Sequence, residues 1–152
     1  MRRKKDLDTV DLEVLRLLYS DPRVTYEMIA EKLGTSAVTV HNRLKKLKEA
    51  KLVRECVSIA PQVFDKNVTA FIQISTVPGQ ERKVAQLISE VPEVIKVKGT
   101  TGDFDLIVEI VARDVDELQQ LVMDRIRALD NVVRTNTILL LFSVKDELSY
   151  VP

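Results

Sequence analysis

Two short amphipathic segments, separated by a tight turn that contains glycine, constrain the fold of this chain more than any other feature. Apolar residues recur at helical spacing from Thr25 to Leu33, and Gly34 suits the end of that helix because glycine adopts positive φ at little cost. Ser36 is placed to cap a further helix that runs to about Ala50. With a supporting helix over residues 7–19, this order predicts a helix-turn-helix unit.

The last of these helices has one face that the core leaves free. Its apolar stripe faces inward and consists of Ala37, Val40, Leu44 and Leu47. At about 100° per residue, the remaining surface collects hydroxyl, amide and cationic groups, which donate hydrogen bonds to phosphates and base edges. We therefore expect double-stranded DNA to be contacted by Ser36, Val38, Thr39, Asn42, Arg43, Lys45 and Lys46.

The distribution of charge supports a polyanionic partner. The whole chain is neutral, with 23 basic and 23 acidic side chains. Residues 1–60 nevertheless hold 13 basic and 9 acidic groups, and residues 32–54 hold seven basic groups against Glu49 alone. Residues 61–152 hold 10 basic and 14 acidic groups. Such a local excess of positive charge is typical of a surface that binds nucleic acid.

The pattern changes after the first sixty residues. Residues 52–59 resemble a strand that would form part of a wing, and residues 61–67 resemble a hinge. Beyond the hinge, we expect strands over 69–77, 94–100, 104–112 and 132–144, with helices over 81–91 and 115–129. This β-α-β-β-α-β order predicts an α+β, ferredoxin-like domain. The expected domains are a winged helix-turn-helix over 1–60, a hinge over 61–67 and a ferredoxin-like domain over 68–152.

The last expected strand is apolar on both sides. Ile138, Leu140 and Phe142 alternate with Leu139 and Leu141, and the strand over 104–112 has a similar pattern. Because helices cover one face of such a sheet, the other face would be an apolar patch open to solvent. We expect a second copy of the chain to cover it, and the resulting homodimer would present two recognition helices to DNA.

Residue counts argue against several classes of protein. Cys56 is the single cysteine, which excludes an intramolecular disulfide and a multi-cysteine zinc site. His41 is the single histidine, which argues against a histidine-based triad or a multi-histidine metal site. Asp103 and Asp105 lack a third ligand or a base, so we expect neither a metal nor a catalytic site. No apolar run reaches the roughly 18 residues of a membrane span, and the N-terminus lacks a signal-peptide core. We expect a cytoplasmic protein that is not an enzyme and has no cofactor.

The chain resembles the Lrp/AsnC family, also called the feast/famine or leucine-responsive regulators, over nearly its whole length. The first set of matching motifs is Leu7-Asp8-x-x-Asp11, Leu15 to Leu18, Asp21-x-Arg23, Ile29-Ala30, Leu33-Gly34-x-Ser36, Val40-x-x-Arg43-Leu44 and Leu47. The second set is Gly99-x-x-Gly102-Asp103-Phe104-Asp105, Asp114, Thr135 and Thr137. Two departures are Asn131-Val132, where the family usually has Gly-Val, and Ala50-Lys51, where it commonly has a glycine.

The resemblance implies a transcription regulator whose DNA binding or assembly responds to a small amino-acid effector. It also implies dimers that assemble into tetramers or octamers. The effector residues that the resemblance suggests are Gly102, Asp103, Phe104, Thr135 and Thr137. Glycine lets a ligand approach the backbone, and an aspartate can accept a hydrogen bond from an ammonium group.

Two other functions share features with this pattern. An RNA-recognition module has the same β-α-β-β-α-β order, but residues 104–108 lack the basic and aromatic motif that stacks bases, and the domain is acidic. An amino-acid sensor that acts through protein contacts without DNA binding stays open as the alternative.

Overall fold

The computed structural model describes residues 7–145, which divide into two compact units between Val57 and Ser58. Each unit has its own hydrophobic core. Among the described helices, none combines the length and the apolar character that crossing a membrane requires.

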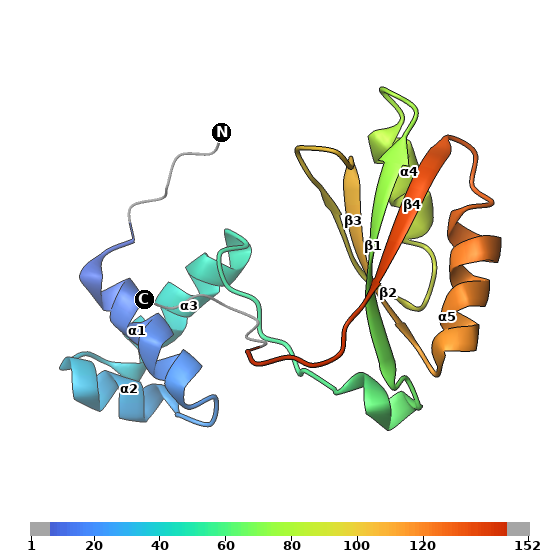
Figure 1. Cartoon of the computed structure of the whole chain (residues 1–152). Coiled ribbons are helices and arrows are strands. Elements are labelled where there is room, and N and C mark those ends of the chain that lie inside the picture. The colour runs from blue at the N-terminus through green and yellow to red at the C-terminus, as the bar shows by residue number, and fades with distance from the viewer. Residues whose placement is uncertain (1–6, 146–152) are drawn as a thin grey trace. The chain divides into compact units, whose positions relative to one another are not determined.

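The first unit is a helix-turn-helix, as predicted (Figure 1). Its helices are α1 (Thr9–Ser20), α2 (Tyr26–Leu33) and α3 (Ala37–Glu49). Each begins at a side chain that accepts a hydrogen bond from a backbone amide of the first turn, and these caps are Asp8, Thr25 and Ser36. Gly34 ends α2 at φ 61°, the left-handed conformation that was expected of it.

The core of the first unit uses the apolar stripe that the sequence predicts for α3. Val40 and Leu44 are almost completely buried against Val14 of α1 and Ile29 of α2. Burial of side chains of this size contributes about 1.5–3 kcal/mol each. The stripe therefore determines which side of α3 remains open to solvent.

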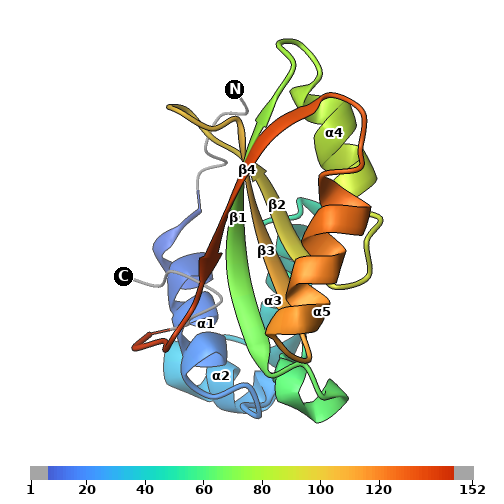
Figure 2. The ribbon, with the colours of Figure 1, turned by 45° about the vertical axis from the view of Figure 1, so that its right-hand side comes forward.

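The second unit has the predicted β-α-β-β-α-β order. A short 3-10 turn, η1 (Pro61–Phe64), precedes β1 (Val68–Thr76), α4 (Glu81–Ile88), β2 (Val94–Gly99), β3 (Leu106–Ala112), α5 (Val115–Leu121), the π-helical turn η2 (Val122–Ile126) and β4 (Val132–Leu139). The strands form one antiparallel sheet in the order β2-β3-β1-β4, and α4 and α5 cover one of its faces (Figure 1; Figure 2). This is the ferredoxin-like arrangement.

The register of β1 places alternate side chains on opposite faces of the sheet. Ile72 and Ile74 are fully buried with Val84 and Ile88 of α4, so even-numbered residues of β1 point toward the helices. Gln73 of β1 lies on the open face, opposite Ile107 and Asn136.

The open face is mixed in character, so the prediction that both faces are apolar is wrong. Asn136 Nδ2 donates to Gln73 Oε1 at 2.8 Å, and Lys96 forms an ion pair with Glu109 at 2.8 Å. Apolar side chains remain between these polar pairs, because Phe71 lies opposite Ile138 in the register and Ile107 is opposite Gln73. The hydrophobic pattern of the sequence did not reveal that polar residues on different strands would pair here.

Two predicted strands differ from the structure. β4 ends at Leu139, so it is shorter than the strand predicted over 132–144, although the Leu140 amide still donates to the Thr69 carbonyl of β1 at 2.9 Å. The strand predicted over 52–59 does not form at all. A strand needs a neighbour for its N–H and C=O groups, and none of the four described strands pairs with this segment. The predicted helix over 115–129 begins as expected but continues only as η2.

Candidate nucleic-acid interface and effector region

The solvent-facing side of α3 carries most of the predicted DNA-binding residues. Val38 is 69% exposed, and Asn42, Lys45 and Lys46 are also exposed. Among the described residues, no ion pair engages Lys45 or Lys46. Their charges therefore stay available to an external anion.

The start of α3 is fixed by local hydrogen bonds. Ser36 Oγ accepts from the Thr39 amide at 3.1 Å and lies 2.9 Å from the Thr39 hydroxyl. Ser36 is thus the N-cap of α3 and positions the first turn of the helix. The cap uses part of the hydrogen-bonding capacity of the Ser36 hydroxyl. Thr39 is half-buried one turn before Arg43.

Arg43 has partners that the sequence analysis missed. Its Nη1 donates to Asp8 Oδ2 at 2.6 Å and to Asp11 Oδ1 at 2.8 Å, and its side chain is 29% exposed. Hydrogen bonds to these two carboxylates raise the pKa of the guanidinium. Hydrogen bonds from the Asp11 amide and from Arg43 hold the pKa of Asp8 below its ordinary value. The motif Leu7-Asp8-x-x-Asp11 contains both carboxylates, but nothing in its spacing indicates that they would face Arg43.

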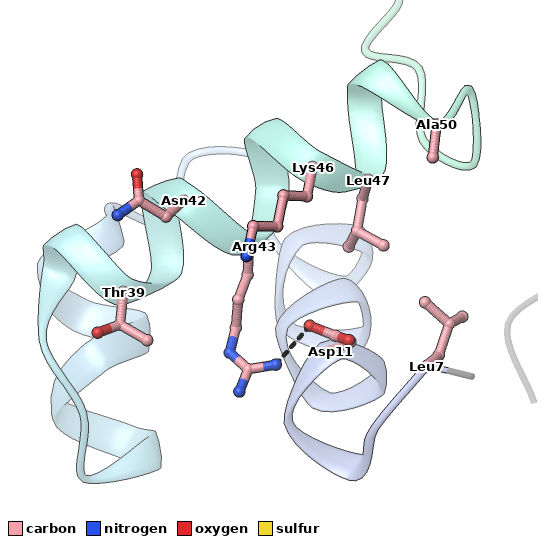
Figure 3. A pocket seen from close by; sticks show the side chains of 8 residues that line it. All are labelled: Leu7, Asp11, Thr39, Asn42, Arg43, Lys46, Leu47 and Ala50. Atoms are coloured by element: carbon pink, nitrogen blue, oxygen red, sulfur yellow. Dashed lines mark hydrogen bonds and ion pairs between the residues drawn. The ribbon is translucent and has the colours of Figure 1, made fainter. Parts of the chain in front are cut away.

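The ion pair lies in a hollow of about 420 Å³ between the start of α1 and α3. Figure 3 shows Arg43 extending from α3 toward Asp11, whereas Asn42 and Lys46 extend elsewhere. The hollow is lined by Leu7, Asp11, Thr39, Asn42, Arg43, Lys46, Leu47 and Ala50. It therefore joins the predicted DNA-binding face to the acidic first turn of α1.

A second ion pair ties the end of α3 to the chain that follows. Lys48 Nζ lies 2.6 Å from Glu55 Oε1, and a hydrogen bond to this carboxylate raises the pKa of Lys48. Lys51 adopts positive φ (57°) just after the helix, where the family commonly has a glycine. The helix thus ends without the glycine, at the cost of a conformation that non-glycine residues seldom adopt.

The turn over residues 99–105 is held by hydrogen bonds at both ends. The Thr100 amide donates to the Asp105 carbonyl at 2.8 Å, and the Thr100 hydroxyl donates to the Phe104 carbonyl at 2.6 Å. Asp105 Oδ2 accepts from the amide of Thr76 at 2.7 Å and from its hydroxyl at 3.1 Å. Gly102 has φ 121°, which only glycine adopts without strain. Hydrogen bonds to Asp105 thus connect the turn to the end of β1.

The structure groups the predicted effector residues differently from the sequence interpretation. The Phe104 ring lies 5.0 Å from the Arg134 guanidinium, and Ser75 Oγ donates to the Asp103 carbonyl at 3.3 Å. Arg134 is opposite Ser75 in the register, on the open face of the sheet. Gly102, Asp103 and Phe104 therefore share one region with these two side chains, which had not been predicted.

Thr135 and Thr137 lie on the other side of β4. They are opposite Ile74 and Ile72, whose side chains face the helices. Because side chains alternate along a strand, the two threonines do not share a face with Arg134. A shift of the β1–β4 register by one residue would place the two threonines on the open face instead. The register does shift once along this pair of strands, at a bulge between Ser75 and Thr76.

Comparison with known proteins identifies both units. The AsnC-type helix-turn-helix domain matches residues 7–48, and the Lrp/AsnC ligand-binding domain matches residues 69–150. The chain belongs to the Lrp/AsnC family. The resemblance that the sequence motifs indicated is thereby confirmed.

Named relatives and solved structures match the chain over most of its length. An uncharacterized HTH-type transcriptional regulator of Pyrococcus horikoshii is 33% identical over 93% of this chain and 97% of its own. The HTH-type transcriptional regulator FL11 of Pyrococcus furiosus is 29% identical, with 89% of each chain covered. The structure of Escherichia coli AsnC superposes with a TM-score of 0.89 at 23% identity, covering 97% of this chain and 99% of the other.

A further solved structure is a complex with an amino acid. It is that of a transcriptional regulator from Neisseria meningitidis with L-Met, and its TM-score is 0.84 at 24% identity, with 95% of this chain and 96% of the other covered. At this identity the likeness establishes the fold. Within residues 7–145, no group of three or more histidine, cysteine or acidic side chains is arranged to hold a metal ion.

Proposed function

We propose that this Lrp/AsnC protein is a transcription regulator that binds specific sequences of double-stranded DNA through the exposed side of α3. The observation that supports this most strongly is the combination of exposed Asn42 with exposed, uncompensated Lys45 and Lys46 on one helix of a helix-turn-helix. An amide side chain can read adenine through two hydrogen bonds, and lysines neutralise phosphates.

The two matched domains suggest a separate function for each part of the chain. We assign DNA binding to residues 1–60, the hinge to 61–67, and oligomerisation with effector sensing to 68–152. The helix-turn-helix match over 7–48 and the ligand-binding-domain match over 69–150 support this assignment. Within the second unit, Lys66 Nζ lies 3.0 Å from Glu117 Oε1, so the end of the hinge is anchored to α5. We place the protein in the cytoplasm, together with its DNA.

The DNA-binding proposal is tested by selecting genomic fragments with the purified protein and measuring affinity against salt concentration. Lys46→Ala should reduce the slope of log K against log salt by about 0.9, because one phosphate contact is lost. Asn42→Ala should relax the preference at one base pair by about 1–3 kcal/mol. Lys83→Ala, at an exposed lysine of α4, is the matched control and should change neither quantity. A protein that selects no fragment would support the alternative sensor that acts without DNA.

We further propose that an amino acid binds near the turn over 99–105. Phe104 and Arg134 supply a ring and a cation there, and the guanidinium can hold a carboxylate. The complex of the Neisseria meningitidis regulator with L-Met supports this class of ligand. Thermal denaturation in the presence of each of the twenty amino acids is the test. If none raises the melting temperature of the wild type, the effector proposal is wrong for amino acids.

Self-association is the third part of the proposed function. Leu141 and Phe142 are 83% and 81% exposed, and Phe71 and Ile138 lie opposite one another on the open face of the sheet. A second copy that covers these side chains would remove them from water, which is favourable by about 25 cal/mol per Å² of apolar surface. We expect a homodimer that assembles further to a tetramer or octamer. Light scattering should give a mass of at least twice 17.3 kDa, and a monomer at micromolar concentration would contradict the proposal.

A further inference from the structure

Asp8 and Asp11 each divide their two carboxylate oxygens between two tasks. Asp8 Oδ1 accepts from the Asp11 amide at 2.8 Å, and Asp11 Oδ2 accepts from the Asp8 amide at 3.3 Å, which forms the capping box of α1. The remaining oxygens, Asp8 Oδ2 and Asp11 Oδ1, both accept from Arg43 Nη1. The same two carboxylates therefore cap α1 and hold the side chain of Arg43 in the middle of α3.

Because Arg43 is already paired with two carboxylates, its positive charge does not attract DNA as the charge of an unpaired cation would. One guanidinium faces two carboxylates, so the cluster carries a net negative charge. If Arg43 turned to a phosphate, two neighbouring carboxylates would be left without their cation, next to an incoming polyanion. Coulomb repulsion would oppose that exchange. Lys45 and Lys46, by contrast, have no such partner among the described residues.

We propose that Arg43 is a positioning residue, which fixes α3 against α1 and does not itself contact DNA. This inference rests on the proposed DNA binding and revises the role that the sequence suggested for Arg43. Thr39, Asn42 and Lys46 line the same hollow as Arg43 and lie within one turn of it on α3. An anchor at Arg43 therefore sets the direction in which these three side chains meet the DNA.

The fold does not depend on this anchor, so the inference can be tested by substitution. The N-cap at Ser36 and the buried contacts of Val40, Leu44 and Leu47 remain when Arg43 is replaced. Arg43→Ala should weaken binding to the selected fragment about tenfold but leave the salt slope unchanged. Lys46→Ala is the comparison, because its slope should fall by about 0.9.

An exchange of charges distinguishes positioning from direct contact. In the double variant Asp11→Arg with Arg43→Asp, the guanidinium lies on α1 between Asp8 and the new carboxylate, and the net charge is unchanged. Positioning predicts that this variant recovers most of the affinity that Arg43→Ala loses. A salt slope reduced by about 0.9 in Arg43→Ala, or a stable exchange variant with no recovery of affinity, would overturn the inference.

A second double variant tests the same inference if the protein with exchanged charges does not fold. Asp8→Asn with Asp11→Asn keeps the capping oxygens, since asparagine is a good N-cap, but removes the ion pairs. Positioning predicts a lower ratio of affinity for the selected fragment over a scrambled duplex, and an unchanged or higher ratio would contradict it. If the wild type selects no fragment, the proposed function fails. The anchor would then be judged by melting temperature alone, which Arg43→Ala should lower and the exchange should restore.

Discussion

The turn over residues 99–105 allows the strain of one backbone conformation to be measured with an internal control. Gly102 has φ 121°, and a Cβ built there meets no atom within 4 Å. Gly102→Ala therefore incurs backbone strain, of order 1–3 kcal/mol, without a steric clash. Replacing glycine also reduces the entropy of the unfolded chain, which offsets about 0.4–1 kcal/mol.

Gly99→Ala is the matched control in the same turn. Its Cβ would lie 4.0 Å from the Asp105 carbonyl oxygen, which is an ordinary contact, and Gly99 is not among the positive-φ residues. The unfolded-state term is the same for both variants, so the difference between them isolates the strain at Gly102. We expect Gly99→Ala to be neutral or slightly stabilising.

Urea unfolding of the full chain, followed by circular dichroism, measures this difference. With a slope of about 1–3 kcal/mol per molar urea, the midpoints of the two variants should differ by about 1 M, with Gly102→Ala the less stable. Equal midpoints would refute the argument, because they would mean that the turn relaxes without cost. Gly102 is also a predicted effector residue, so the thermal response to amino acids should be compared between the same two variants.

Two further predictions concern a core residue of the first unit and a charged residue of the second. Leu44→Ala should lower the free energy of unfolding of the helix-turn-helix unit by about 2–5 kcal/mol, since the side chain is 1% exposed. An unchanged free energy of unfolding in urea would contradict the burial of this side chain. Hydrogen bonds from the Arg113 amide and from Lys66 hold the pKa of Glu117 below its ordinary value of 4.5. Its contribution to stability is therefore complete above pH 4.5 and is lost as the pH falls through the lowered value. Glu117→Gln should flatten the acid side of the melting-temperature profile, and parallel profiles for both proteins would exclude this role.

Much of the fold follows from short-range patterns in the sequence. The caps at Asp8, Thr25 and Ser36 act on backbone amides within the next three residues, and Gly34 ends its helix by its own conformational freedom. The alternation of helical and extended segments in the second half also predicts the ferredoxin-like order. These features depend on residues that are neighbours in the chain, so a linear pattern contains them.

The predictions that failed depend on residues that are distant in the chain. A strand over 52–59 has suitable residue types but no described strand to pair with, and the open sheet face is interrupted by Gln73 and Asn136, which are 63 positions apart. The effector residues were predicted from motif positions and stay a prediction, but their grouping on the sheet was not visible in the sequence. Register decided that Arg134, and not Thr135, shares a face with Ser75.

The sequence by itself determined the family, the order of the elements and the face of α3 that stays exposed, because periodicity and capping act over a few residues. Only the tertiary structure decided which charged groups on that face are already paired within the protein. Arg43 lies 32 positions from Asp11 and 35 from Asp8, and folding brings all three within hydrogen-bonding distance. A cation counted in the sequence is a potential phosphate ligand. In the folded chain, two carboxylates of α1 pair with Arg43, whereas no ion pair among the described residues engages Lys45 or Lys46.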